Sequence, residues 1–486
     1  MLKTTWIALL LGFWSLLYLL NIFLRSYRKC ARQYQEFEER YGISVSVAQV
    51  RWYSTSLNHL FLKIGQSHSS LLGGWFSLGI WFGIVAMVAS LTLLVVMLCK
   101  TFIQDSSTEQ VLTPVMPGIN LPMSQILYYF VTLSVCGILH EFGHAVAAVR
   151  EQVRVNGFGM FIFIIYPGAY VDLYTEHLHA ISPLRQLRIY CAGVWHNFII
   201  VVVCVALLSC LPIILLPFYT TGSGAIVTNV VENSPVYGER GLSRGYKLLS
   251  INGCSINKEE DWSMCIIDAI HQPTRGYCMS LDEINQLNTA KKVFKSVDGS
   301  IQCCSNTSLA DLCFTYSSKG ASDKKHACVA ARPVTDRVSC STYRDCIVYR
   351  DMACLHPSLP NNTYLLRILH DSGPAVLYVG DPHLLLYIVS VSGYIPRYTS
   401  LPVDLPNILD TLLKYLISLS GALALLNSVP CYALDGQWIL TALIEHVCQK
   451  SIPKAKDRQF LANCILLCGT FVLVSNILLA MWTLLR

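Results

Sequence analysis

The sequence predicts an α-helical membrane protein with about six transmembrane helices. Of its 486 residues, 53% are apolar and only 14% are charged, a balance that excludes an ordinary soluble protein. The first apolar run has no small-residue cleavage site, so we expect residues 1–24 to be retained as an anchor. The runs long enough to cross a bilayer are residues 5–24, 73–99, 122–147, 187–217, 407–430 and 460–485.

Positive charges beside these runs predict the orientation of the chain. By the positive-inside rule the cationic connections lie in the cytoplasm, which places both termini in the lumen. The net charge of +6 is spread over these connections, so it indicates topology and a lipid bilayer as partner, with no nucleic acid. The cations are Arg25, Arg28, Lys29, Arg32, Arg150, Arg154, Arg185, Arg188, Lys450, Lys454, Lys456 and Arg458.

Two segments beside the spans carry other signals. Residues 25–72 form a polar connection that we expect to be partly helical. Segment 156–172 is rich in aromatic and β-branched residues and closes with a Pro-Gly turn at Pro167-Gly168. It is too short for a comfortable span, so we expect a membrane-associated β-hairpin at 158–172, or a re-entrant element, that lines a cavity or is buried in protein.

Residues 222–400 read as a separate domain of short strands and turns. A strand-like stretch at 224–230 is followed by Ser234-Pro235-Val236-Tyr237, which opens a short helical stretch, and by a Gly-Leu-x-x-Gly turn and a strand ending in Asn252-Gly253. This order resembles a PDZ domain, with 383–391 expected to supply a late strand. The alternative is a generic β-rich luminal domain.

Ten of the 20 cysteines lie within 254–354, which we interpret as an insertion into the PDZ-like domain. An even, dense set in one polar segment predicts disulfides in an oxidising lumen. Asn306 and Asn361 begin glycosylation sequons in the same region. A zinc cluster is the alternative, although the spacings lack a repeated Cys-x-x-Cys pair. The cysteines are Cys254, Cys265, Cys278, Cys303, Cys304, Cys313, Cys328, Cys340, Cys346 and Cys354.

The sequence His140-Glu141-Phe142-Gly143-His144 lies at the end of the third apolar run. Histidines four apart share one helix face and can bind one Zn²⁺, and the glutamate beside them can exchange protons with an activated water. A lone histidine would more often be a core residue, but ionisable groups at membrane depth indicate function. The motif therefore suggests hydrolysis inside a membrane.

A third metal ligand has to come from elsewhere, because the run Ala145-Val146-Ala147-Ala148-Val149 contains none. Asp435 is the best remaining candidate, since it is a lone carboxylate in apolar surroundings between a helix-breaking Pro430 and Gly436. Its alternative role is that of an ordinary turn aspartate at a membrane edge.

These motifs together resemble the site-2 proteases, a family of intramembrane zinc metalloproteases. The family pattern is His-Glu-x-x-His, then Gly-x-x-x-Asn, then Leu-Asp-Gly, each in or beside a span. Here the same order is His140 to His144, Gly193-Val194-Trp195-His196-Asn197 and Leu434-Asp435-Gly436. The resemblance extends from about 122 to 445. It implies a catalytic core of residues 122–217 and 407–445, flanked by spans 73–99 and 460–485.

The resemblance also implies the role of each site residue. His140, His144 and Asp435 would hold one Zn²⁺, and Glu141 would be the general base and acid. Asn197 and Gly193 would lie at the substrate, although an Asn in a membrane helix can simply bond to a neighbouring helix. His196 is expected to be a packing or orienting residue.

The implied substrates are membrane-spanning segments with an unwindable helix, cut after an earlier luminal cleavage. They would belong to membrane-tethered transcription factors, including sterol regulatory element-binding proteins and stress-response factors, in the Golgi or the endoplasmic reticulum. The hairpin would offer an edge for pairing with the extended substrate. The alternatives are a catalytically inactive membrane scaffold and a metal or solute transporter with the same fold.

Overall fold

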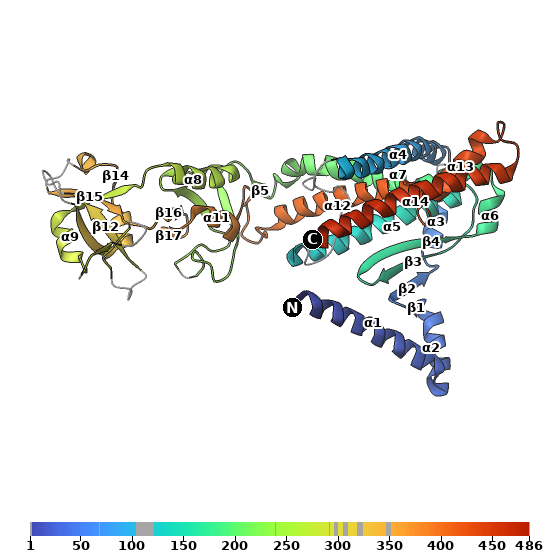
Figure 1. Cartoon of the computed structure of the whole chain (residues 1–486), viewed down its shortest axis with the longest axis horizontal. Coiled ribbons are helices and arrows are strands. Elements are labelled where there is room, and N and C mark those ends of the chain that lie inside the picture. The colour runs from blue at the N-terminus through green and yellow to red at the C-terminus, as the bar shows by residue number, and fades with distance from the viewer. Residues whose placement is uncertain are drawn as a thin grey trace. The chain divides into compact units, whose positions relative to one another are not determined.

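The computed structural model of the chain (Figure 1) describes residues 2–67, 69–103, 121–238, 240–290, 292–295, 300–304, 310–317, 324–346 and 351–485. It contains two compact units. The first, the membrane unit, combines Met1–Ser209 with Asp410–Arg486, and the second, the inserted unit, is Cys210–Leu409.

Six helices in the described part of the chain are long and apolar enough to cross a membrane, which confirms the predicted multi-span architecture. Each contains a window of high mean hydropathy with few charges, as a helix surrounded by lipid requires. They are α1 (Leu2–Ser26), α4 (Ser69–Ile103), α5 (Ile126–Arg150), α7 (Pro183–Leu215), α12 (Leu405–Ser428) and α14 (Ala455–Leu485).

Shorter helices complete the membrane unit. A buried core joins α4, α7 and α14 to the short helix α13 (Asp435–Cys448) through Ile80, Leu187, Ile439 and Leu466. A second core packs α5 against the helix α3 and a β-sheet. The remaining short helices of this unit are α2 (Arg28–Tyr41), α3 (Asn58–Gln66), the 3₁₀ turn η1 (Met123–Gln125) and α6 (Thr175–Ala180).

The sheet of the membrane unit has four antiparallel strands in the order β1-β2-β3-β4. The last two form the expected hairpin, while β1 and β2 come from the polar connection, where the sequence predicted only partial helix. Strands β3 and β4 pack on α5. The strands are β1 (Ile43–Ser46), β2 (Gln49–Ser54), β3 (Val155–Phe163) and β4 (Tyr166–Leu173).

The predicted Pro-Gly turn of the hairpin is wrong. The chain reverses at Ile164, which has a left-handed φ of 57°, and Pro167 and Gly168 lie inside β4, opposite Ile162 and Phe161. Proline fits a strand where its missing N–H faces away from the ladder. A Cβ at Gly168 would lie 2.4 Å from the tip of the Phe161 ring, so a larger residue there would require that ring to shift.

The inserted unit begins with a sheet in the order β17-β16-β7-β6-β18, with β8 on β7. Its core contains Val227, Leu248, Trp262, Ile368 and Leu385. A separate two-stranded ladder joins β5 (Tyr219–Thr220) to β19 (Ile395–Pro396). The other elements here are β6 (Ala225–Val230), β7 (Lys247–Ile251), β8 (Cys254–Ser255), α8 (Glu259–His271), β16 (Tyr364–His370), β17 (Val376–Gly380), α11 (Pro382–Ile388) and β18 (Val389–Ser392).

Two local predictions in this domain are wrong. The expected strand 383–391 is helical up to Ile388, because Asp381 caps the backbone N–H of His383 and Pro382 occupies the first helical turn. Only its last residues join β18. Ser234 begins a turn rather than a helix, since Gly238, with φ 116°, ends it at once. The PDZ-like fold itself stays a prediction.

A second sheet, in the order β13-β12-β15-β9-β14, lies in sequence between α8 and β16. Tyr277, Phe314, Val329 and Leu355 form its core. Its elements and neighbours are β9 (Gly276–Ser280), α9 (Leu281–Leu287), β10 (Phe294–Lys295), β11 (Ile301–Gln302), β12 (Asp311–Tyr316), β13 (Lys325–Ala330), α10 (Ala331–Thr335), β14 (Ser339–Cys340), the 3₁₀ turn η2 (Tyr343–Cys346) and β15 (Met352–Pro357).

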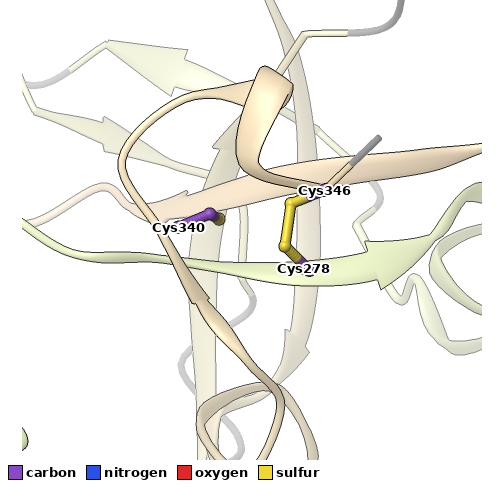
Figure 2. A group of neighbouring side chains, drawn as sticks. All are labelled: Cys278, Cys340 and Cys346. Carbon is purple, nitrogen blue, oxygen red and sulfur yellow. A yellow bond between two sulfur atoms is a disulfide. The ribbon is translucent and has the colours of Figure 1, made fainter. Parts of the chain in front are cut away.

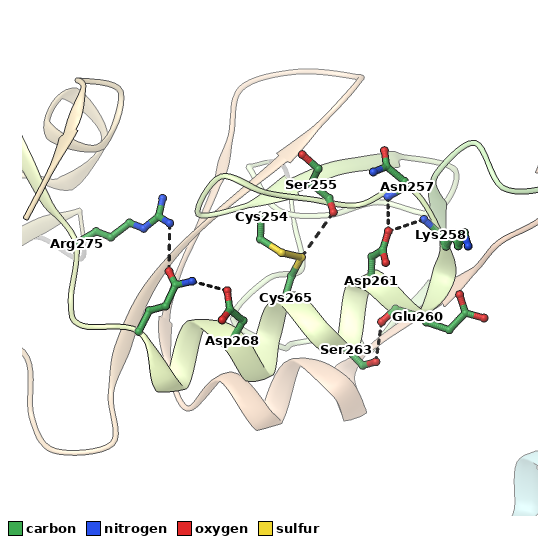
Figure 3. The surroundings of a disulfide bond; sticks show 11 residues. Cys254, Ser255, Asn257, Lys258, Glu260, Asp261, Ser263, Cys265, Asp268 and Arg275 are labelled. Atoms are coloured by element: carbon green, nitrogen blue, oxygen red, sulfur yellow. Dashed lines mark hydrogen bonds between the residues drawn. A yellow bond between two sulfur atoms is a disulfide. The ribbon is translucent and has the colours of Figure 1, made fainter.

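All ten cysteines within residues 254–354 form disulfides, which confirms the disulfide prediction. One bond ties β8 to α8, where Asp261 also accepts the N–H groups of Asn257 and Lys258 (Figure 3). Figure 2 shows how closely three of the sulfurs gather on β9, β14 and η2. A zinc cluster would need thiolates, so the bonds argue against that alternative. The pairs are Cys254–Cys265, Cys278–Cys346, Cys303–Cys313, Cys304–Cys328 and Cys340–Cys354.

Candidate metal centre

Helix α5 presents His140 and His144 on one face, and the structure brings Asp435 to them from α13. Both imidazoles are buried, and their Nε2 atoms lie 3.2 Å apart. The Asp435 Oδ2 atom lies 2.9 Å from Nε2 of His140 and 3.3 Å from Nε2 of His144. Three potential ligands thus converge although the aspartate follows His144 by 291 positions.

The chain reaches this geometry through a tight break between α12 and α13. After α12 ends, Pro430 cannot continue a helix, and Ala433 adopts a left-handed φ of 72°. Asp435 then begins α13, next to Gly436, where a Cβ would lie 1.9 Å from the carbonyl oxygen of Val429. Only glycine fits that position, so the Leu-Asp-Gly sequence fixes the carboxylate at the helix start.

The three ligand atoms have the spacing of a zinc site. Ligands that lie about 2.0–2.2 Å from a tetrahedral zinc are roughly 3.3 Å from one another. The observed separations of 2.9, 3.2 and 3.3 Å agree with that value. Two imidazoles and one carboxylate form a donor set typical of catalytic zinc, which leaves a fourth position for water. The residues therefore fit the ion.

Partners on α7 orient both histidine rings. Nδ1 of His144 donates to the carbonyl oxygen of Ile189 at 2.7 Å, which directs its Nε2 toward the metal position. The Asn197 amide lies 3.1 Å from Nδ1 of His140, and within the described part of the chain its Oδ1 atom is buried without a partner. The amide atom that faces Nδ1 is Nδ2. Since a His140 bound through Nε2 carries its proton on Nδ1, turning the amide over would bring Oδ1 there as the acceptor.

Two glycines let α5 and α7 approach closely at the site. A Cβ on Gly193 would lie 2.4 Å from Nε2 of His144 and 2.5 Å from Nε2 of His140. A Cβ on Gly143 would lie 2.6 Å from Nδ1 of His196. Gly193 thus leaves space for the two imidazoles, while His196 packs against α5 and donates to the carbonyl oxygen of Ala192.

Glu141 faces strand β4. Its Oε2 atom accepts the backbone N–H of Val171 at 3.0 Å. This N–H lies on the outer edge of β4, which pairs with no other strand among the described residues. Ala169 shares that edge, since its nitrogen lies 3.9 Å from the Cβ position of Gly137, one helical turn before Glu141. The hairpin edge and the glutamate are therefore direct neighbours.

The sequence did not single out Asn427 or Ser420. Asn427 Nδ2 lies 3.5 Å from Nε2 of His140, and the Ser420 hydroxyl donates to the carbonyl oxygen of Asn197 at 3.0 Å. Both are polar residues in the last two to three turns of the apolar helix α12, and polarity at that depth is the signal that could have found them.

The predicted glycosylation residues lie far from this centre in sequence. Asn361 is exposed in the turn between β15 and β16, where an acceptor asparagine is accessible. Asn306 lies outside the described residues.

Comparisons with known proteins find two similarities. Residues 128–316 match Peptidase family M50, a range that includes the histidine pair and Asn197. The chain is also 27% identical over 440 residues to the membrane-bound transcription factor site-2 protease homolog of Arabidopsis thaliana, covering 80% of this chain and 84% of the relative. With its six candidate spans, the chain is a multi-pass membrane protein that is similar to the peptidases of family M50 and to a site-2 protease homolog.

Proposed function

We propose that the protein is a zinc endopeptidase that hydrolyses peptide bonds within membrane-spanning segments. The observation that supports this most directly is the convergence of His140, His144 and Asp435 beside Glu141, with ligand atoms 2.9 to 3.3 Å apart. The centre lies on a helix long and apolar enough to span a bilayer.

The residues divide the chemistry between them. A zinc ion held by the three ligands would polarise the scissile carbonyl and lower the pKa of the attacking water. Glu141 accepts the proton of that water and delivers it to the leaving amine. Asn197 and the Ile189 carbonyl keep the imidazoles in the tautomer that ligates through Nε2. We infer that Asn197 acts through His140, while direct contact of Asn197 or Gly193 with substrate stays a prediction.

The substrate has to be extended before it can be cut, because a helix hides its peptide bonds in its own hydrogen bonds. The outer edge of β4 supplies the backbone groups that can pair with such a segment. On this edge Ala169 lies beside Gly137 of α5, and Val171 contacts Glu141. An unwound segment paired there lies next to the proposed base, so helix-weakening residues near the scissile bond should favour cleavage.

For substrates we propose membrane-tethered transcription factors, the class of protein after which the Arabidopsis relative is named. The resemblance to the family supports sterol regulatory element-binding proteins and stress-response factors, cut after a prior luminal cleavage in the Golgi or endoplasmic reticulum. The disulfides and the exposed Asn361 support a luminal, glycosylated inserted unit. The order of its turn and strand motifs supports the PDZ-like domain that we propose there.

The test combines zinc content with cleavage of a single-span substrate, both measured on the purified full chain in lipid. Glu141→Gln should retain zinc and lose cleavage, whereas Asp435→Ala should lose both. Glu260→Gln, at an exposed carboxylate of α8, is the control and should change neither. Normal cleavage by Glu141→Gln would refute the proposal. Metal movement across vesicles without any cleavage would favour a transporter, and zinc binding with neither activity would favour a scaffold.

A further inference from the structure

Helix α1 contacts the sheet through two polar side chains. Among residues 8–26, Trp14 and Asn21 are the two that are buried, at 8% and 5% exposure. They are seven residues apart and so share one helix face. The indole N–H of Trp14 donates to the carbonyl oxygen of Ile164 at 3.1 Å, and the amide of Asn21 donates to that of Val45 at 2.9 Å.

The Trp14 contact holds a strained turn. Ile164 has a φ of 57°, a conformation that β-branched residues rarely adopt. Its N–H donates to the carbonyl oxygen of Ala48 at 2.9 Å, and Ala48, in the turn of the first hairpin, also has a positive φ of 55°. The two hairpin turns are therefore joined by a backbone hydrogen bond, and Trp14 binds the carbonyl oxygen of Ile164. Strain of this kind persists only where neighbours impose it.

Asn21 holds the opposite edge of the sheet. Its Nδ2 atom donates to Val45 on β1, while its Oδ1 atom accepts the hydroxyl of Tyr34 on α2 at 3.0 Å. An amide in an otherwise apolar span is costly unless both of its ends are bonded. Here both ends are bonded, and one of them satisfies a main-chain group on an edge strand.

The sheet connects these contacts to the active site. Val45 lies opposite Val50, Val50 opposite Ile162, and Ile162 opposite Pro167. From Pro167, β4 continues for four residues, about 13 Å, to Val171 and its hydrogen bond with Glu141. Helix α1 thus holds one end of the β4 edge and α5 holds the other.

We propose that Trp14 and Asn21 are positioning residues that set the β4 edge relative to Glu141, and so select which peptide bond of the extended substrate is cut. This inference rests on the proposed function. Strand pairing repeats every two residues, so a loosely held edge allows the substrate to slip by two residues, about 6.6 Å. The scissile bond then changes while the zinc ligands stay in place.

The variants remove single donors and have matched controls. Trp14→Phe keeps the aromatic ring and removes the N–H, and Trp482→Phe, at an exposed indole on α14, is its control. Asn21→Leu removes the amide. Its control is Asn476→Leu, which breaks a comparable bond from α14 to the carbonyl oxygen of Leu94, away from the sheet. Asn21→Gln retains the amide donor, so its kinetics and cleavage site should be close to those of the unmodified protein.

Cleavage of a single-span substrate is followed by kinetics and by mass spectrometry of the products. Trp14→Phe and Asn21→Leu should each lower kcat/KM by roughly 3- to 20-fold, the range for one interhelical hydrogen bond in a membrane. Both should keep their zinc and add a product displaced by two residues. Both controls should cut at the original bond only. Unchanged kinetics and a single product in both variants would overturn the inference, as would the same displaced product from Asn476→Leu.

A second readout does not depend on catalysis. Gly137→Cys with Ala169→Cys places two thiols across the contact between α5 and β4, in a background where the exposed free cysteines Cys99, Cys210, Cys464 and Cys468 are serine. Adding Trp14→Phe or Asn21→Leu should slow disulfide formation, and an unchanged rate would contradict the inference. If the unmodified protein cuts no membrane substrate, the proposed function fails, while this crosslinking rate still tests how the edge is held.

Discussion

Gly193→Ala should remove the metal. The added Cβ would lie 2.4 and 2.5 Å from the Nε2 atoms of His144 and His140, the two proposed zinc ligands. Because non-bonded heavy atoms settle at roughly 3.5 Å, both rings have to move by about 1 Å. Zinc–ligand distances hold to within about 0.2 Å, so that displacement breaks the site. Alanine has a higher helix propensity than glycine. A loss of zinc in this variant therefore cannot be explained by a weakened helix.

The assay measures zinc per protein by mass spectrometry and cleavage of a reconstituted substrate. Gly193→Ala should contain little zinc, and a displacement of about 1 Å should reduce cleavage at least ~100-fold. Gly421→Ala on α12 is the matched control, because its Cβ would meet Val201 at an ordinary 3.7 Å. A Gly193→Ala protein with full zinc and cleavage within a few-fold of the unmodified chain would refute the reasoning.

Three further predictions follow from contacts already described. Asn197→Ala should weaken zinc binding by about 10- to 100-fold. Asn197→Asp keeps an acceptor for His140 and should lose less zinc affinity. Equal zinc titrations of both variants and the unmodified chain would contradict this prediction. Val171→Pro removes the N–H that Glu141 accepts and should lower kcat by about 10- to 100-fold with zinc retained. Ala169→Pro, at the edge proposed to pair with substrate, should chiefly raise KM. Identical kinetics in the two variants would refute separate roles for Val171 and Ala169. Asn361→Gln should remove one glycan, seen as a mobility shift that endoglycosidase treatment abolishes, and an unchanged mobility would count against a luminal position for that turn.

The parts of the protein that the sequence could predict depend on local signals. Long apolar runs identify the spans because lipid demands about 20 residues of apolar helix. The histidine pair is recognisable because four residues are nearly one helical turn. Asp435 could be selected because a lone carboxylate is rare in apolar surroundings, but its arrival at His140 depends on how α12 and α13 pack.

The errors lie where tertiary contacts override local preference. The hairpin turn was expected at Pro167 because Pro-Gly is a frequent turn sequence. The chain instead turns at Ile164, a residue with poor turn propensity that Trp14 and Ala48 hold in place. Strands β1 and β2 were missed because they are only four and six residues long. They are stabilised by tertiary pairing, β1 on β2 and β2 on β3.

The separation of the proposed ligands along the sequence also bears on how the protein is synthesised. His144 and Asp435 are 291 positions apart, with the inserted unit between them. At a synthesis rate of 5–20 residues per second, the ribosome needs roughly 15 to 60 s to pass from one to the other. During that interval the nascent chain has a histidine pair without its carboxylate and cannot cut neighbouring membrane proteins. If Asp435 is the third ligand, as proposed, proteolytic competence arises only after the inserted unit has been translated and the later helices have entered the bilayer.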